Sequence, residues 1–292
     1  MRVTLQGKAT AAVIDTMGAE LVSFHDLLGN EYLWQGDPQY WSGQAPFLFP
    51  IVGCLRNGKV WINGEEYHMP RHGIVRKMEF RPVMANEETA MFSLRANADT
   101  QKSYPFDFSL MVTYRLSDCT LSTDLQVMNF DQKPMPFAIG GHPAFRCPVL
   151  EGETFENYML EFDEEETLVS PLLSRDTGLI DFSDTRIVLE HGKRLPLQHS
   201  LFDQDALVLS GLKSHVVRLV SRLSGRGIEM QFDDFPYLGV WSAKGDAPFV
   251  ALEPWTGCAT ATDEGDCMED KRGMILLPPG QSAKFTYHIT IQ

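Results

Sequence analysis

The chain has 292 residues, 43% of them hydrophobic, and a formal net charge of −14. This negative charge argues against nucleic acid and anionic membranes as partners, because both require a basic surface. The N-terminal segment MRVTLQGKAT lacks the apolar stretch of a signal peptide, and no apolar run is long enough to predict a membrane helix. The five cysteines form no CxxC pair and lack zinc-type spacing, which is typical of a cytoplasmic protein and predicts no metal site.

Short strand-like segments follow one another along the chain, and helical periodicity is scarce. Asn63-Gly64 is the clearest local signal, because it predicts a two-residue hairpin. Single helical turns are expected near residues 38–41 and 201–206, and the acidic run 163–166 is interpreted as a solvated face. No linker divides the chain, so we predict one all-β domain over residues 1–292, a large antiparallel β-sandwich. Strands are expected at 8–14, 20–24, 31–34, 59–62, 78–83, 90–96, 106–116, 120–129, 159–162, 216–220, 227–232, 237–241 and 283–291.

Two irregular segments follow the first predicted strands. Segment 44–58, QAPFLFPIVGCLRNG, holds two prolines and two glycines among apolar residues, which favours a rigid wall over a plain strand. Arg56 could point its guanidinium inward from this wall, or it could lie on the surface. In segment 68–76, HMPRHGIVR, His72 precedes a glycine and could be either a site residue or a turn residue.

Segment 137–145, FAIGGHPAF, places His142 after an apolar run and two glycines. Glycine permits positive φ and the close approach of another chain or a ligand, and Pro143 biases His142 towards an extended backbone. Histidine has an unperturbed pKa of about 6.5, which suits proton transfer near neutral pH. A buried histidine in a tight turn is the alternative interpretation.

Segment 249–257, FVALEPWTG, is a buried-strand pattern that ends in a carboxylate. Burying Glu253 is unfavourable unless its charge is used or is paired, for instance with an arginine in the core. Pro254 is expected to end the strand, and Trp255 offers a flat apolar face of the kind that sugars bind through their C–H groups. Residues 237–241 are expected to form the neighbouring strand, with Trp241 either in the core or in the cleft.

Four motifs in this order resemble the aldose 1-epimerase (galactose mutarotase-like) family and its bacterial LacX-like branch. They are APFLFPIVG at 45–53, RHGIVR at 71–76, GGHPAF at 140–145 and LEPWTG at 252–257. The resemblance implies a large β-supersandwich with a shallow sugar cleft and no metal or organic cofactor. It also implies that His142 is the general acid and Glu253 the general base. His72 and Arg56 would hold the sugar, and the aspartate that binds sugar hydroxyls would be Asp205, with Asp203 as the rival.

The sequence therefore predicts an aldose 1-epimerase that interconverts the α and β anomers of an aldohexose. Arg71 and Arg76 flank His72 and could receive a phosphate, so a hexose-6-phosphate 1-epimerase is the alternative within the family. A non-catalytic sugar-binding protein would not need an acid–base pair, and a glycoside hydrolase would need two carboxylates astride the bond. We expect a small sugar as the partner, with Arg76 and Trp241 among its contacts, and a cytoplasmic monomer or homodimer.

Overall fold

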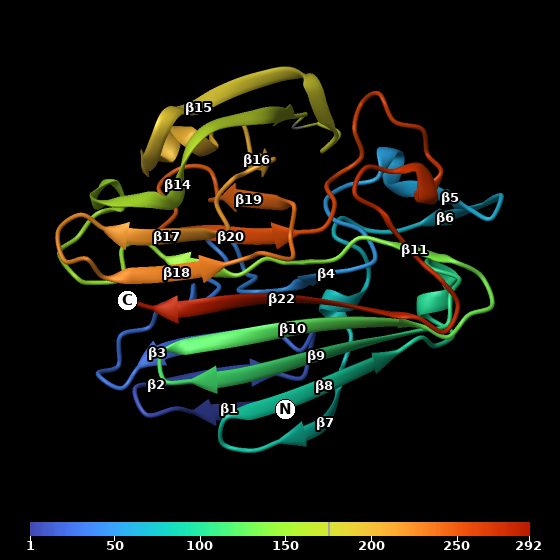
Figure 1. The fold of residues 1–292 in the computed structure, drawn as a ribbon, viewed down its shortest axis with the longest axis horizontal. Coiled ribbons are helices and arrows are strands. Elements are labelled where there is room, and N and C mark those ends of the chain that lie inside the picture. The colour runs from blue at the N-terminus through green and yellow to red at the C-terminus, as the bar shows by residue number, and fades with distance from the viewer. Residues whose placement is uncertain (175) are drawn as a thin grey trace.

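The computed structural model describes residues 1–174 and 176–292, and within them the chain is almost entirely strands and loops (Figure 1). The described residues contain no α-helix, only 3-10 turns, and none of them belongs to a helix with the length and apolarity needed to cross a membrane. The prediction of an all-β protein is therefore confirmed. The 3-10 turns are η1 (Arg56–Gly58), η2 (Val75–Lys77), η3 (Thr100–Lys102), η4 (Phe155–Asn157), η5 (His199–Phe202) and η6 (Met268–Asp270).

A nine-stranded antiparallel sheet runs from β15 at the top of Figure 1 to β7 at the bottom. Its order is β15 (Ile180–Pro196), β14 (Tyr158–Leu173), β17 (Val216–Ser221), β18 (Gly227–Gln231), β22 (Ser282–Ile291), β10 (Thr120–Asn129), β9 (Phe108–Ser117), β8 (Thr89–Arg95) and β7 (Arg81–Ala85). A second sheet has the order β16 (Leu207–Ser210), β19 (Tyr237–Trp241), β20 (Phe249–Trp255), β12 (Gly140–Gly141) and β4 (Phe47–Leu48), with β13 (Ala144–Arg146) also paired to β20.

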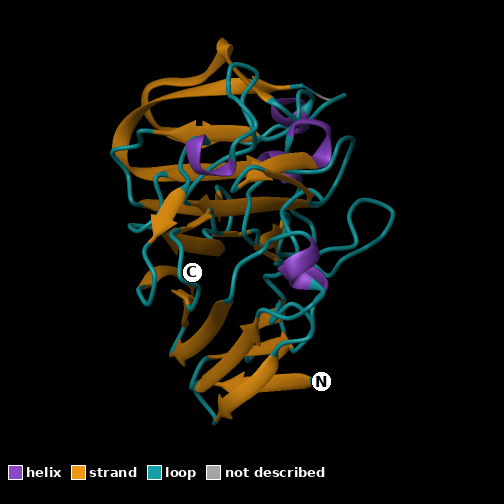
Figure 2. Cartoon of the chain, turned by 90° about the vertical axis from the view of Figure 1, so that its right-hand side faces the viewer, coloured by secondary structure: helices purple, strands orange, loops and turns teal. Residues whose placement is uncertain are grey.

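Smaller sheets complete the fold. They are β1 (Arg2–Gln6) with β2 (Thr10–Asp15) and β3 (Leu21–Asp26), β5 (Lys59–Ile62) with β6 (Glu65–His68), and β11 (Met135–Phe137) with β21 (Ile275–Leu277). The two large sheets pack face to face around a shared core, and Figure 2 shows this strand-rich fold from the side. Phe47 of β4 contacts Tyr114 of β9, with ring centroids 6.3 Å apart. Apolar residues from both large sheets fill one continuous core, so the second sheet is held rigidly against the first.

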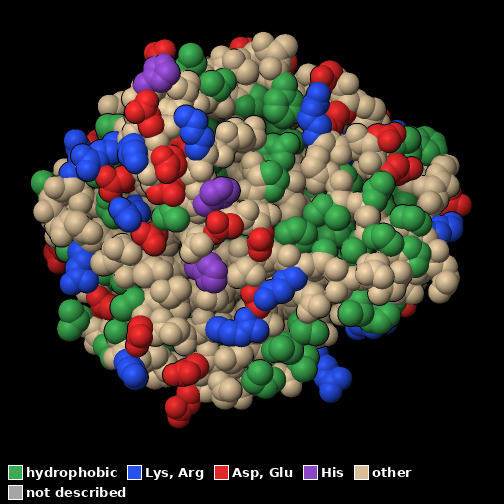
Figure 3. Space-filling view, in the orientation of Figure 1, with side chains coloured by type: hydrophobic (Ala, Val, Ile, Leu, Met, Phe, Trp, Pro, Cys, Tyr) green, Lys and Arg blue, Asp and Glu red, His purple; other side chains and the backbone are tan. Residues whose placement is uncertain are grey.

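Charged side chains of both signs are interspersed over the face shown in Figure 3. On the outer side of the nine-stranded sheet, Arg194 pairs with Glu161 at 2.8 Å and Arg218 pairs with Glu229 at 2.8 Å. The arginines of these strands are thus opposed by carboxylates. This face offers a phosphate backbone no continuous basic surface.

Most predicted strands are present, and residues 59–62, 120–129 and 237–241 match their predicted bounds. Asn63-Gly64 joins β5 to β6 as the hairpin signal predicted. Segment 31–34 differs, because Glu31 and Leu33 form only isolated bridges. The larger difference is the long ribbon of β14 and β15, of which only residues 159–162 were expected. β15 is mostly exposed and pairs with β14 through several register shifts, so it lacks the regular apolar alternation that marks a half-buried strand.

The acidic run in β14 is not wholly solvated. Residues 163–165 are exposed, but Glu166 is only 4% exposed. One of its oxygens accepts backbone N–H bonds from Lys213 at 2.8 Å and from Ser214 at 2.7 Å. This carboxylate therefore fixes the loop before β17, a role that charge patterning does not reveal.

Pro254 does not end its strand, because β20 continues to Trp255 and pairs Pro254 with Leu238 of β19. On the other side of β20, Gly140 pairs with Trp255 and Ala144 pairs with Ala251, which is one unbroken register. Pro254 has no N–H to donate across this ladder. The segment that pairs with β20 is accordingly not a continuous strand, and its strand assignment is interrupted between β12 and β13. His142 lies in that gap, so the register that runs through both strands sets it opposite Glu253.

Gly73 fixes the backbone beside His72. It has a φ of +76°, and a Cβ at this position would lie 2.1 Å from the carbonyl oxygen of Phe49. We expect Gly73→Ala to lower the free energy of unfolding by roughly 2–4 kcal/mol, because backbone strain and a clash with main chain add. Gly64→Ala is the matched control, since Gly64 has a φ of +83° and a Cβ added there would meet nothing within 4 Å. Urea denaturation of both variants measures the difference, and equal losses would refute the proposed clash.

Candidate functional site

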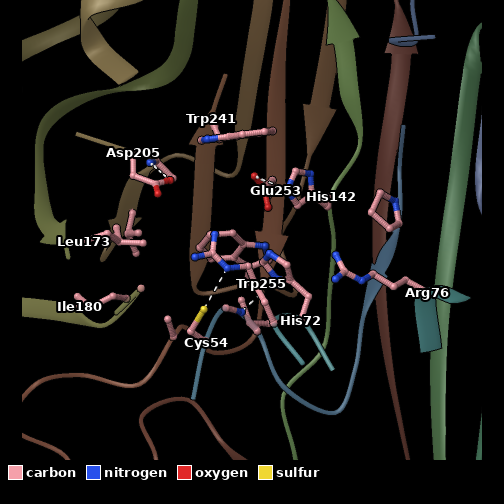
Figure 4. Close-up of a pocket in the computed structure, with 18 of the residues that line it drawn as sticks. Cys54, His72, Arg76, His142, Leu173, Ile180, Asp205, Trp241, Glu253 and Trp255 are labelled. Atoms are coloured by element: carbon pink, nitrogen blue, oxygen red, sulfur yellow. Dashed lines mark hydrogen bonds and ion pairs between the residues drawn. The ribbon is translucent and has the colours of Figure 1, made fainter. Parts of the chain in front are cut away.

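A cavity of about 220 Å³ opens where β19 and β20 meet the irregular segments before β5 and β7 (Figure 4). Six of the residues predicted to form a site line it: His72, Arg76, His142, Asp205, Trp241 and Glu253. The structure thus brings together side chains that are up to 181 positions apart, from 72 to 253 in the sequence. Other lining residues include Trp41, Cys54, Arg71, Leu173, Ile180 and Trp255.

His142 and Glu253 form the centre of the cavity. Nε2 of His142 lies 3.3 Å from Oε1 of Glu253, and the two side chains are 9% and 2% exposed. Residues opposite each other in neighbouring antiparallel strands project to the same face, which explains this contact. Nδ1 of His142 and Oε2 of Glu253 are buried and have no hydrogen-bond partner among the described residues. Buried polar atoms left unpaired are unfavourable, so the pair has unused capacity to bind a polar ligand.

Burial shifts the pKa values of this pair in opposite directions. It lowers the pKa of His142 to about 3, and the positive charge of Arg76 adds to this effect. Burial also raises the pKa of Glu253 well above its usual range, with a further rise from the negative charge of Asp205. Burial therefore disfavours a proton on His142 in the empty cavity. Near neutral pH the pair carries one proton, and burial favours its residence on the carboxyl group.

Aromatic side chains form the walls. The ring of Trp41 stacks on His142 with a centroid distance of 4.7 Å and an interplanar angle of 27°. Trp241 meets His142 edge to face, with ring centroids 5.6 Å apart. Of the two positions considered for Trp241, the core and the cleft, the structure shows the cleft. The stacking fixes the imidazole plane. Trp41 was not predicted as a site residue, because its turn at residues 38–41 contains no neighbouring motif that marks chemistry.

Trp255 lies flat because two glycines leave room for it. A Cβ on Gly140 would lie 2.5 Å from the indole of Trp255, and one on Gly239 would lie 2.4 Å from it. Gly239 also pairs with Glu253 across β19 and β20. The Gly140-Gly141 motif predicted the close approach of another group, and that group is the indole of Trp255 in the cavity wall. The indole Nε1 of Trp255 is buried and has no hydrogen-bond partner of normal geometry within the described chain, but it lies near enough to Glu253 to act against the rise in the pKa of that carboxyl group.

His72 is held by its neighbour Gly53 through both its ring and its backbone. The backbone N–H of Gly53 donates to Nδ1 of His72 at 3.1 Å, and the N–H of His72 donates to the carbonyl of Gly53 at 2.8 Å. Because Nδ1 accepts a bond, the neutral ring carries its proton on Nε2. Burial holds the pKa of His72 well below its usual value, as do the nearby His142 and Arg76. His72 is thus a neutral hydrogen-bond donor, with its ring 5.7 Å from that of His142.

Arg56 does not line the cavity, contrary to the expectation that it holds the sugar. Its Nε donates to Asp266 at 3.2 Å, and its Nη2 donates to the carbonyls of Ala261 and Glu264 at 3.1 and 2.8 Å. The turn η1, which starts at Arg56, directs the side chain towards the 261–266 loop. Arg56 is therefore a structural clamp on that loop.

Arg71 and Arg76 supply the cationic side of the cavity instead. Arg76, which was expected among the sugar contacts, lines the cavity from residues 75–77, which form the turn η2. Burial, together with the charge of Arg71, lowers the pKa of Arg76, and Glu20 partly offsets the effect. Nε of Arg71 donates to the sulfur of Cys54 at 3.0 Å.

Asp205 lies on the other side of Glu253 from Arg76 in Figure 4. It has a φ of +71°, and its Oδ1 accepts the N–H of Ala206 at 2.8 Å. Asp203, the rival candidate, is exposed and does not line this cavity. The position of the two residues therefore favours Asp205 as the aspartate of the cleft. No group of three or more His, Cys, Asp or Glu residues in the described parts of the chain is arranged to hold a metal ion.

Comparisons with known proteins point to one family. Residues 1–290 match the family model described as Aldose 1-epimerase. The chain is 44% identical over 299 aligned residues to Protein LacX of Lactococcus lactis subsp. lactis, covering 100% of this chain and 99% of that protein.

Two solved structures are similar over the whole chain. The galactose mutarotase related enzyme of Lactobacillus acidophilus is 30% identical with a TM-score of 0.95, and the match covers 100% of this chain and 97% of the other. A galactose mutarotase-like protein of Lactobacillus casei is also 30% identical, with a TM-score of 0.91 and full coverage of both chains. The fold is thus of the galactose mutarotase-like type.

Proposed function

Because this chain belongs to the aldose 1-epimerase family, we propose that it interconverts the α and β anomers of a free aldohexose. The observation that carries the proposal is the buried pair of His142 and Glu253, 3.3 Å apart and open to the cavity. Anomerisation needs an acid and a base at two oxygens on the same carbon, O5 and O1. A sugar whose anomeric carbon faces this pair meets that requirement.

The chemistry requires one proton on the pair. In ring opening, Glu253 takes the proton of O1–H while His142 gives a proton to O5. The C1–O5 bond breaks with its electron pair going to O5, and C1=O1 forms. Rotation about C1–C2 presents the other face of the aldehyde, and closure returns one proton to His142 and one to O1. The pair holds a single proton before and after each step, in agreement with its opposed pKa shifts.

Burial affects the two forms of the pair differently. The empty cavity favours neutral His142 and protonated Glu253, which is the form needed for ring closure. Ring opening uses the ion-pair form, which the sugar hydroxyls and the unpaired Nε1 of Trp255 can stabilise by hydrogen bonds. His72 donates from Nε2, Asp205 accepts from sugar hydroxyls, and the indoles pack on the C–H faces of the ring. These contacts orient the sugar without taking part in proton transfer.

The direct test is anomer exchange followed by polarimetry or NMR, starting from pure α-glucose and α-galactose. We expect catalysed equilibration well above the spontaneous rate for at least one free aldose. If sugars bind but no aldose is equilibrated faster than in buffer, the protein is a carbohydrate-binding module and the proposal is refuted.

A second substrate class is supported by the two arginines in the cavity wall. If Arg71 and Arg76 reached one anion together, two charge-assisted contacts of about 1.5–3 kcal/mol each would favour a hexose 6-phosphate by roughly 10²–10⁴ in kcat/KM. We expect instead that free glucose and galactose are turned over as well as glucose 6-phosphate, because Nε of Arg71 is already engaged by Cys54. Measuring the three sugars on wild type, Arg71→Ala and the exposed control Arg146→Ala distinguishes the classes. A strong phosphate preference that only Arg71→Ala removes would reassign the substrate.

The pH profile follows from the shared proton. At low pH a second proton binds to the pair, on His142, and leaves no group that can act as the base. The lowered pKa of His142, about 3, places the acid limb of the pH profile far below the value for an ordinary histidine. At high pH Glu253 loses the last proton, which leaves no acid, and its raised pKa places that limb above the range of an ordinary carboxylic acid. We expect kcat/KM to form a broad plateau through neutral pH. An acid limb near pH 6.5, the value for a solvated histidine, would contradict the assignment.

A further inference from the structure

Trp41 covers one face of the imidazole of His142. The two rings stack with centroids 4.7 Å apart and an interplanar angle of 27°. Trp241 and His72 meet the same imidazole edge to face, at centroid distances of 5.6 and 5.7 Å, and Glu253 contacts its Nε2. The His142 side chain is only 9% exposed, whereas Trp41 is half-buried. The indole of Trp41 therefore lies between the imidazole and the solvent on one side of the ring.

The segment that precedes β4 holds this indole in place. Nε1 of Trp34 donates to the carbonyl of Trp41 at 2.8 Å, and the N–H of Trp41 donates to the carbonyl of Asp37 at 2.9 Å. Trp34 is buried and packs on Phe249 of β20, with ring centroids 4.7 Å apart. Gly43 leaves room for the indole of Trp41, because a Cβ there would lie 2.5 Å from it. The cover is thus tied to β20, the strand that carries the proposed base.

An aromatic ring stacked on an imidazole has two opposing effects on the pKa of that imidazole. Its electron-rich face attracts the imidazolium form and raises the pKa, whereas its bulk keeps water away and lowers the pKa. The pKa of His142 is lowered to about 3, and burial is the largest cause. At this ring the exclusion of water therefore outweighs the attraction of the aromatic face.

The charged and titratable groups near His142 belong to other segments than the cover. Those of the described cavity wall are Cys54, Arg71, His72, Arg76, Asp205 and Glu253. Among them, Arg76 acts on the pKa of His142 in the same direction as burial. On the segment of Trp41 itself, Asp37 is exposed and its Oδ1 accepts the N–H of Gln39 at 2.9 Å. A substitution at Trp41 leaves all these groups in place, so its main effect on His142 is to admit water.

We propose that Trp41 is a positioning residue, whose indole keeps water from His142 and holds the imidazole in the plane in which Nε2 faces Glu253. This inference rests on the proposed function, because it concerns the acid of the same site. A solvated imidazole would bind a second proton for the pair at mildly acidic pH, and the pair would then lack a base. Under the cover of Trp41 the pair keeps a single proton over a wider range of pH. Trp41 therefore sets how far into acid the reaction continues.

The kinetic test compares Trp41→Ala, which uncovers the imidazole, with Trp41→Phe, which keeps a ring over it. Water that reaches His142 should raise its pKa from about 3 towards 6.5, the value for a solvated histidine. Wild-type kcat/KM for glucose should then be similar at about pH 5 and about pH 7.5, whereas that of Trp41→Ala should be roughly tenfold lower at about pH 5. Trp41→Phe should restore most of the wild-type profile. The control Trp61→Ala changes a tryptophan that is 41% exposed and outside the cavity, and should not alter the profile.

An NMR titration without sugar tests the cover independently of turnover. The chain has eight histidines, so the His142 signal is assigned by its absence from His142→Ala. We expect the titration midpoint of His142 to rise by more than about one pH unit in Trp41→Ala and to stay near the wild-type value in Trp41→Phe. If no aldose is equilibrated, the proposed function fails, but this midpoint still decides the role of Trp41. Should Trp41→Ala not fold, Trp41→Gln keeps much of the bulk and brings a polar group to the ring, so a raised midpoint is expected there too.

Three results would overturn the inference. An unchanged His142 midpoint, with kcat/KM lowered by the same factor at every pH, would make Trp41 a packing residue. A rise in KM with kcat and the pH profile unchanged would make it a sugar contact. A midpoint that falls in Trp41→Ala would mean that the indole acts on His142 by attracting the imidazolium form and not by excluding water.

Discussion

Glu253→Gln is expected to lower kcat for anomer exchange by about 10²–10⁴-fold, with little change in sugar affinity. The amide keeps the shape of the side chain and can still contact His142, but it cannot accept the proton of O1–H. The variant should also be more stable than the wild type at neutral pH. The raised pKa of Glu253 means that folding favours its protonated form, so its contribution to stability is lost as pH rises above the value of the unfolded chain.

Glu166→Gln is the matched control, because it changes another buried glutamate that lies outside the cavity. We expect normal kcat and a free energy of unfolding lower by roughly 1 kcal/mol, since the charge that accepts two backbone N–H bonds is removed. Steady-state kinetics and thermal unfolding of both variants give the comparison. Near wild-type turnover in Glu253→Gln would exclude Glu253 as the base.

His142→Ala is expected to have the second large effect, again about 10²–10⁴-fold in kcat, because His142 is the group that protonates O5 in the proposed mechanism. The change leaves a space beside Trp41, which in the wild type stacks on the imidazole at 4.7 Å. Added imidazole should occupy that space and restore part of the activity. Rescue that increases with imidazole concentration and saturates would identify proton transfer as the missing step.

His72→Ala provides the contrast. His72 donates a hydrogen bond to the sugar in our proposal, so its loss should raise KM more than it lowers kcat. If instead His72→Ala abolishes turnover and His142→Ala only weakens binding, the roles of the two histidines are exchanged. The same assay with glucose and galactose on both variants measures this split.

The sequence by itself predicted the all-β class and most of the strands. The period-two alternation over residues 120–129 and the Asn63-Gly64 turn depend only on neighbouring residues. Such local patterns predict the strand and the hairpin that the structure contains. His142 and Glu253 could also be named from sequence, because each follows an apolar run and precedes a proline. The two residues come into contact because the register of β20 with β12 and β13 continues across Pro254 and sets His142 opposite Glu253.

Only the tertiary structure decided which other groups face the sugar cavity. Arg56 and Arg76 both lie in irregular segments, where the direction of a side chain depends on distant partners. Arg56 binds Asp266 and its loop, away from the cavity, whereas the turn at residues 75–77 directs Arg76 towards the cavity. Trp41 enters the site through stacking alone, which leaves no trace in local sequence. The protonation of the pair of His142 and Glu253 also depends on the tertiary structure. A pKa depends on burial and on charges brought near by folding, and neither can be read from the order of residues along the chain.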